Sequence, residues 1–285
     1  MYLEFFGFSE KPFSITPDIQ FLYLGKQHEK ALQTLLYSIR ERLGFSLLTG
    51  EVGAGKTMLS RALLSRLDQS VETALLINPL LSVPELLKTI TKDFGIAIRS
   101  ITPQKLMEAL NRFLIEVSNA GKTALVVIDE AQNLSSEALE AIRLLTNLET
   151  EKQKLLQILL VGQPELLKKL KQHDLRQLNQ RISSRVHLSP LEFIEMMRYI
   201  NHRISMAGGS GKVFFDPKAY RLLYSESKGY PRLINLLCDR ALMSAYVRES
   251  YIVDKDDLKT AICDFRGKEQ APIWTVLKRF LLSAR

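Results

Sequence analysis

The chain has 285 residues and a net charge of +8 at pH 7, from 39 Lys and Arg against 31 Asp and Glu. Its length exceeds that of one typical domain and allows a large buried core. No stretch reaches the ~18 consecutive apolar residues of a membrane-spanning helix, and the N-terminus lacks the features of a signal peptide, so we expect a cytoplasmic protein. The two cysteines, Cys238 and Cys263, lie in helical patterns without metal-ligand spacing and are expected to be reduced thiols.

Apolar runs alternate with helical patterns up to Pro190, which is typical of a parallel α/β sheet. The expected strands are 45–49, 73–77, 124–128, 157–161 and 186–188. The expected helices between them are 56–68, 84–94, 103–119, 135–148 and 164–171. After Pro190 only helical patterns remain, near 191–207, 217–227, 231–249 and 254–265. This order predicts an α/β core followed by a small all-helical lid.

The first motif is a glycine-rich loop. Residues 50–57, Gly-Glu-Val-Gly-Ala-Gly-Lys-Thr, fit the pattern G-x-x-x-x-G-K-S/T between a strand and a helix. Glycines let the backbone wrap around phosphates, and the start of the following helix favours an anion. Lys56 is expected to reach the β- and γ-phosphates and Thr57 to hold Mg²⁺. The residues expected to bind a nucleoside triphosphate are Gly50, Glu51, Val52, Gly53, Ala54, Gly55, Lys56, Thr57 and Met58.

An acidic pair follows a second buried strand. The run 123–128, Thr-Ala-Leu-Val-Val-Ile, is apolar and β-branched, as a strand buried on both faces should be. Asp129 and Glu130 come next, at the carboxyl edge where parallel sheets bind their ligands. Asp129 is expected to complete the Mg²⁺ shell, directly or through water, and Glu130 to orient the attacking water. The pair therefore favours hydrolysis over binding alone.

The positive net charge leaves two interpretations open. Excess Lys and Arg either contact nucleic acid or an anionic membrane, or form solvated helix faces. The basic residues are spread out and interleaved with acidic ones, as in Lys-Lys-Leu-Lys at 168–171, which favours helix faces. The histidines, which are scattered and are assigned no chemistry, are His28, His173, His187 and His202.

The order of these motifs resembles that of an AAA+ ATPase. The resemblance implies a P-loop NTPase fold, with a five-stranded parallel sheet followed by a small all-helical lid. It implies that Gln163 is sensor 1, near the γ-phosphate, although Asn or Thr is commoner there; a plain strand-to-helix turn at Pro164 is the alternative. It also implies that Arg232, in Gly-Tyr-Pro-Arg at 229–232, is the arginine of sensor 2, with ordinary helix capping as the alternative.

The same resemblance implies an arginine finger, which reaches the nucleotide of a neighbouring subunit. AAA+ proteins place it in the region that corresponds to residues 175–185. Arg181 is the first candidate, and Arg185 and Arg176 are alternatives. A guanidinium suits this role because its fixed fork spreads positive charge over the transferring phosphoryl group.

The N-terminus is similar to the opening of one family, ExeA or general secretion pathway protein A. The resemblance extends over residues 1–265, with the short MshM-type members of pilus biogenesis nearest in length, and it implies adenine as the base. The expected cofactors are therefore ATP and Mg²⁺. The segments that carry the resemblance are 2–8, 11–17, His28–Glu29, 129–134, 162–166 and 175–178.

Longer members of this family continue into a membrane span and a periplasmic peptidoglycan-binding module. Residues 1–285 contain neither, so neither property is carried over. The segment 272–282 is basic and amphipathic and holds the only Trp, Trp274. It is expected either to dock on a partner or on the inner face of a membrane, or to lie against its own lid.

Four parts are expected: a lead segment at 1–42 packing on the ATPase core, the core at 43–190, the lid at 191–265 and a basic tail at 266–285. The resemblance implies an ATPase in the cytoplasm or peripherally at the inner membrane. It would hydrolyse ATP as a nucleotide-dependent homo-oligomer and drive or regulate assembly of a pilus or secretion apparatus, with that apparatus's assembly proteins as partners. The alternative is a DNA-associated AAA+ ATPase of the transposition-regulator type, which the basic charge leaves open.

Overall fold

A computed structural model describes residues 2–77, 79–98, 102–146, 154–209 and 211–267. Its contacts divide the chain into two compact units. The sheet unit comprises Lys26–Val52 and Lys56–Ser189. The helical unit comprises Met1–Gly25, Gly53–Gly55 and Pro190–Arg285. The expected tail at 266–285 lies, beyond its first two residues, outside the described part of the chain.

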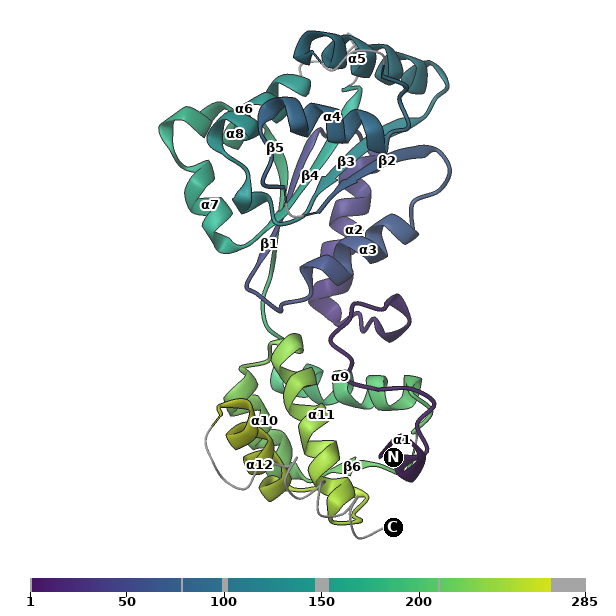
Figure 1. The fold of residues 1–285 in the computed structure, drawn as a ribbon, viewed down its shortest axis with the longest axis vertical. Helices are drawn as coiled ribbons and strands as arrows, with labels where there is room; N and C mark the ends of the chain where they lie inside the picture. The colour runs from purple at the N-terminus through teal and green to yellow at the C-terminus, as the bar shows by residue number, and fades with distance from the viewer. Residues whose placement is uncertain (1, 78, 99–101, 147–153, 210, 268–285) are drawn as a thin grey trace. The chain divides into compact units, whose positions relative to one another are not determined.

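Five parallel strands form the centre of the sheet unit in the order β2-β3-β4-β1-β5, which confirms the predicted sheet (Figure 1). The strands are β1 (Phe45–Gly50), β2 (Val71–Leu76), β3 (Thr123–Ile128), β4 (Leu156–Gly162) and β5 (Ile182–Leu188). β5 begins at Ile182, where 186 was expected, because its first half, Ile-Ser-Ser-Arg, has little of the apolar character that marks a buried strand.

Helices cover both faces of this sheet (Figure 1). They are α2 (Lys26–Arg40), α3 (Lys56–Ser65), α4 (Val83–Asp93), α5 (Pro103–Asn119), α6 (Ser136–Leu145), α7 (Pro164–Leu170) and α8 (Arg176–Arg181), with short 3-10 turns η2 (Ala131–Asn133) and η3 (His173–Leu175). α5 shows why such segments are helical: Leu106, Leu110 and Leu114 recur every four residues and are fully buried on one face. The last two residues of the helix expected at 135–148 lie outside the described residues.

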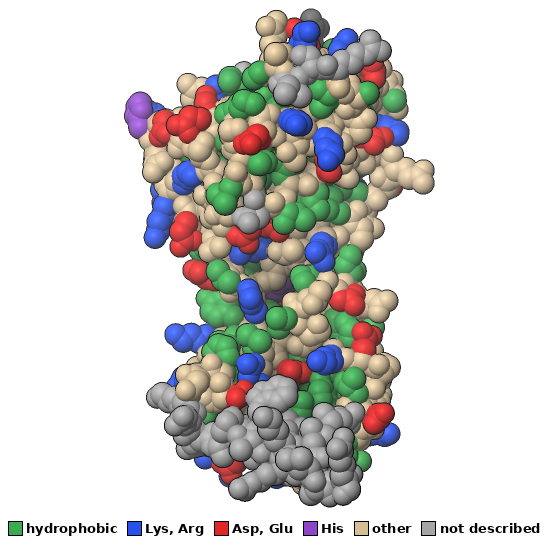
Figure 2. Space-filling model, viewed as in Figure 1, with side chains coloured by type: hydrophobic (Ala, Val, Ile, Leu, Met, Phe, Trp, Pro, Cys, Tyr) green, Lys and Arg blue, Asp and Glu red, His purple; other side chains and the backbone are tan. Residues whose placement is uncertain are grey.

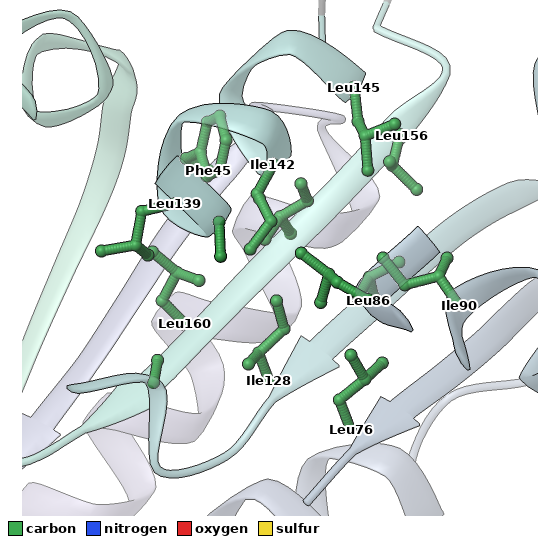
Figure 3. Close-up of a cluster of buried hydrophobic side chains, with 14 of the residues drawn as sticks. Phe45, Leu76, Leu86, Ile90, Ile128, Leu139, Ile142, Leu145, Leu156 and Leu160 are labelled. Carbon is green, nitrogen blue, oxygen red and sulfur yellow. The ribbon is translucent and has the colours of Figure 1, made fainter. Parts of the chain in front are cut away.

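The core of the sheet unit fixes the strands that carry the candidate site. Figure 3 shows part of it, with side chains of α4 and α6 meeting those of the strands. Ile128 and Leu160 are fully buried in this cluster, one residue before Asp129 and two before Gly162. Burying a side chain of this size contributes about 1.5–3 kcal/mol, so the strand ends that follow are held firmly in place.

The helical unit has its own core. Its elements are α1 (Tyr2–Phe6), η1 (Ile19–Phe21), α9 (Phe193–Met206), β6 (Phe214–Phe215), α10 (Pro217–Ser227), α11 (Pro231–Val247), β7 (Ile252–Val253) and α12 (Lys255–Phe265). β6 and β7 pair in parallel, so the prediction that no strand follows Pro190 was wrong. The two strands are two residues long, which is too short to show the alternation by which strands are recognised in sequence.

The lead segment also differs from its prediction. We expected residues 1–42 to pack on the ATPase core, but the first 25 residues belong to the helical unit. Their buried aromatic side chains join the helical core: Tyr2, Phe6, Phe8, Phe13 and Phe21. Only α2, from Lys26 onward, belongs to the sheet unit. The sequence shows that the aromatic residues of the lead segment need an apolar surface, but it does not show which unit provides that surface.

Basic and acidic side chains alternate over the face drawn in Figure 2, which agrees with the interpretation of charged helix faces. None of the described helices combines the length and the hydrophobicity that a bilayer span requires. Cys238 is buried and Cys263 is partly exposed, and both are free thiols as expected.

Candidate functional site

Three strand ends meet at the carboxyl edge of the sheet. β4 lies between β1 and β3, and all three strands run in the same direction. The loop that begins at Gly50, the pair Asp129–Glu130 and Gln163 follow these three strands directly. The topology therefore brings together residues that lie more than a hundred positions apart in the sequence.

The glycine-rich loop has the backbone that its sequence predicted. Gly53 and Gly55 have φ angles of 80° and 99°, a region that other residues rarely adopt. α3 then begins at Lys56, whose Nζ donates to the carbonyls of Gly50 (2.8 Å) and Glu51 (3.0 Å). Burial lowers the pKa of Lys56, while the nearby Glu130 and Asp129 carboxylates act in the opposite direction. The ammonium group is thus partly desolvated, and an anion bound beside it would stabilise its charge.

Thr57 and Asp129 join the loop to the acidic edge. The Thr57 hydroxyl donates to Asp129 Oδ2 at 3.0 Å, and the Glu130 backbone N–H donates to Asp129 Oδ1 at 2.9 Å. Asp129 is only 5% exposed, and this burial raises its pKa against the effect of the two hydrogen bonds. A buried carboxylate beside a hydroxyl would be more favourable with a cation nearby.

Glu130 is held by two amides. Its backbone is left-handed, with φ 55°, at the point where β3 gives way to η2. Its Oε2 accepts hydrogen bonds from Gln163 Nε2 (3.1 Å) and from Gln132 Nε2 (2.5 Å). The structure therefore brings Gln163 to Glu130, whereas its role as sensor 1 stays a prediction. Gln132 had been given no role, although it lies in the segment 129–134 that carries the family resemblance.

The predicted arginine-finger candidates differ in their surroundings. Arg181, at the end of α8, is half-buried and donates to Thr146 Oγ1 at 3.3 Å. Arg185 lies within β5 rather than before it, and it donates to the carbonyl and side chain of Asn179. Arg176 is exposed at the start of α8. The finger therefore stays a prediction with three candidates.

Arg232 and Met58 complete the predicted set. Arg232 is the second residue of α11 in the helical unit, and its role as sensor 2 stays a prediction. Met58 lies half-buried in the first turn of α3. Val52, at the tip of the loop, is 55% exposed, so its side chain does not anchor the loop in the core.

Comparison with known proteins agrees with this geometry. The profile of the AAA domain family matches residues 39–170, which include the loop, the acidic pair and Gln163. Residues 39–170 thus form an AAA domain. The chain is 44% identical over 275 residues to General secretion pathway protein A of Aeromonas hydrophila. This alignment covers 96% of this chain and 50% of that protein. The resemblance to that family is thereby confirmed, and this AAA protein spans about half the length of its relative.

Solved structures show the AAA fold at low sequence identity. The ORC2 protein of Aeropyrum pernix is 18% identical, with a TM-score of 0.65 over 90% of this chain and 72% of that one. The RuvB Holliday junction branch migration motor of Thermotoga maritima is 17% identical, with a TM-score of 0.54 over 84% of this chain and 68% of that one. At these identities the likeness shows the fold alone.

The donor set of this AAA domain fits a magnesium ion together with phosphates. The Thr57 hydroxyl and the Asp129 carboxylate are hard oxygen ligands, the kind that Mg²⁺ prefers, and they lie 3.0 Å apart. Within the described residues no group of three His, Cys, Asp or Glu could hold a metal by itself. Mg²⁺ here would take its remaining ligands from phosphate oxygens and water, as it usually does at nucleotide sites.

Proposed function

We propose that the chain is a Mg²⁺-dependent ATPase whose nucleotide cycle drives or regulates the assembly of a pilus or secretion apparatus. The observation that carries the chemical part is the hydrogen bond between Thr57 and Asp129, which joins the phosphate loop to the acidic edge. The relationship to General secretion pathway protein A supports the biological part. The choice of adenine rests on the same relationship.

Each residue then has one task. Lys56, whose ammonium now donates to two loop carbonyls, would turn to the β- and γ-phosphates. Thr57 and Asp129 would hold Mg²⁺, which neutralises the charge that develops on the phosphates. Glu130 would orient the attacking water and take its proton, while the Gln163 amide keeps the carboxylate beside the end of β4.

Two variants test this assignment. Lys56→Ala should lose triphosphate binding, because the phosphate charge loses its main cationic partner. Glu130→Gln should still bind Mg²⁺-ATP but hydrolyse it about 100-fold or more slowly, because only water activation is lost. Glu116→Gln, an exposed glutamate of α5, is the matched control and should hydrolyse at the wild-type rate. Wild-type turnover by Glu130→Gln would show that this residue has been wrongly assigned.

The biological role needs its own experiment. In a strain that lacks this gene, pilus or secretion assembly should fail and should be restored by the wild-type protein but not by Glu130→Gln. Intact assembly in the deletion strain would contradict the role. An ATP-dependent, salt-sensitive shift of long duplex DNA would instead favour the DNA-associated alternative, for which the net charge of +8 is the motive.

The proposal includes a homo-oligomer. If an arginine of one subunit completes the site of the next, specific activity should rise more than proportionally with protein concentration. ATP should also shift the protein to larger species in sedimentation. Concentration-independent hydrolysis by a monomer would remove this part of the proposal and leave the chemistry of Lys56, Thr57 and Glu130 intact.

A further inference from the structure

One side-chain amide connects two parts of the site. Gln132 Nε2 donates to Glu130 Oε2 at 2.5 Å, and Gln132 Oε1 accepts from the Gln163 backbone N–H at 3.1 Å. We propose that Gln132 is a positioning residue for ATP hydrolysis, which ties the Glu130 carboxylate to the end of β4. This inference rests on the proposed function, because it concerns the reaction at the same site.

The local fold holds the Gln132 amide close to Glu130. Glu130, with its left-handed backbone, is the N-cap of the three-residue 3-10 turn η2, and Gln132 is the middle residue of that turn. Ala131 and Leu134 on either side of Gln132 are fully buried in the core, and their packing fixes the position of the turn. Lys169 of α7 donates to the backbone carbonyls of Gln132 and Leu134 and holds the turn from outside.

The neighbouring strand end leaves room for the amide. A Cβ added at Gly162 would lie 2.9 Å from Gln132 Oε1 and 2.8 Å from Leu166 Cδ2. A side chain at this position would therefore push against the oxygen that accepts the Gln163 N–H. Glycine at the end of β4 and glutamine in η2 fit each other, although thirty residues separate them in the sequence.

The three side chains form a closed set of contacts. Gln163 and Gln132 both donate to Oε2 of Glu130, and Gln132 also accepts from the Gln163 backbone. Within the described residues both of these hydrogen bonds are accepted by Oε2, and none is accepted by the other carboxylate oxygen, Oε1. A movement of Gln163 on nucleotide binding would then reach Glu130 by two routes, one direct and one through Gln132.

Two substitutions separate the two hydrogen bonds of Gln132. Gln132→Glu keeps an acceptor for the Gln163 N–H but cannot donate to Glu130, and it places a second carboxylate beside it. Gln132→Met keeps the length of the side chain and removes both bonds. Both variants lose the hydrogen bond to the Glu130 carboxylate, and a hydrogen bond to a charged group is stronger than a neutral one. Because the carboxylate is then held less firmly, turnover should fall about 10- to 100-fold in both variants. Affinity for Mg²⁺-ATP should stay within about threefold, since Gln132 is not expected to touch phosphate.

The matched control repeats the chemistry away from the site. Gln104 Nε2 donates to Glu108 Oε1 at 3.1 Å on the exposed side of α5. Gln104→Glu and Gln104→Met should bind and hydrolyse ATP like the wild type. A decrease in turnover confined to the Gln132 variants would then reflect the contact with Glu130 rather than the loss of a glutamine.

A double-mutant cycle shows whether Gln132 acts through Glu130. In the Glu130→Gln background, Gln132→Met should cause no further loss of the residual turnover. The inference is overturned if Gln132→Glu and Gln132→Met turn over at the wild-type rate, if their losses persist undiminished in the Glu130→Gln background, or if both lose nucleotide binding. Each of these results leaves the proposed function standing, whereas a wild-type protein without ATPase activity would remove the proposed function itself.

Discussion

Arg203 of α9 fastens the lead segment to the helical unit. Its guanidinium is buried, with the residue only 6% exposed. It donates to the carbonyls of Pro12 and Ser14 (3.2 Å for the latter) and to the Tyr199 hydroxyl (3.1 Å). It also lies 4.8 Å from the ring centroid of Phe21. One side chain therefore contacts three points of the segment 12–21.

Arg203→Met removes these donors and keeps most of the side-chain volume. Hydrogen bonds from a charged donor contribute about 1.5–3 kcal/mol each, and leaving a buried acceptor unpaired costs about 1–3 kcal/mol. Pro12 is buried, so its carbonyl loses its charged hydrogen-bond donor at a position that is little exposed to water. The cost of burying the charge is recovered at the same time and offsets part of the loss. We expect a net loss of about 2–4 kcal/mol.

Urea unfolding measures the total effect, and limited proteolysis shows where it acts. The variant should be cleaved faster within residues 12–21, near the already exposed Ile15 and Ile19. Arg221→Met, an exposed arginine of α10, is the matched control and should change stability by less than about 0.5 kcal/mol. If Arg203→Met unfolded and was cleaved like the control, the attachment of the lead segment would not depend on this arginine.

Three further predictions concern His202, Gly229 and Arg181. Burial lowers the pKa of His202, so below about pH 6.5 the unfolded chain binds a proton more readily than the folded one. The stability of the fold should therefore decrease as the pH is lowered through this range. His202→Gln should lessen the drop in melting temperature from pH 7.5 to 5.5. Gly229→Ala should cost more than about 2 kcal/mol in urea unfolding, because its Cβ would lie 2.0 Å from a backbone carbonyl oxygen; Gly121→Ala has a similar φ but open space and should cost less. Arg181→Ala should bind ATP and hydrolyse it poorly, and mixing it with Lys56→Ala should restore part of the activity; no recovery at any ratio would count against a finger in trans.

The sequence by itself determined the local chemistry of the site. The glycines at 53 and 55 specify a backbone that other residues rarely adopt, and this can be recognised without knowing the rest of the fold. The apolar run before Asp129 marks a buried strand for the same reason, since burial on both faces requires it. Parallel strands all end at one edge, so even the meeting of Lys56, Thr57 and Asp129 could be predicted.

Only the tertiary structure decided the contacts between distant residues whose sequence is locally ordinary. Gln132 lies in the family-like segment 129–134, but no periodicity or spacing there assigns its side chain to Glu130. The contact depends on a left-handed residue and on a glycine in another strand. The aromatic residues of the lead segment predict burial but not the surface that buries them, which Arg203 and the helical core supply. Hydrophobic burial has no direction, whereas hydrogen bonds and steric fit do, and these act only after the chain has brought the partners together.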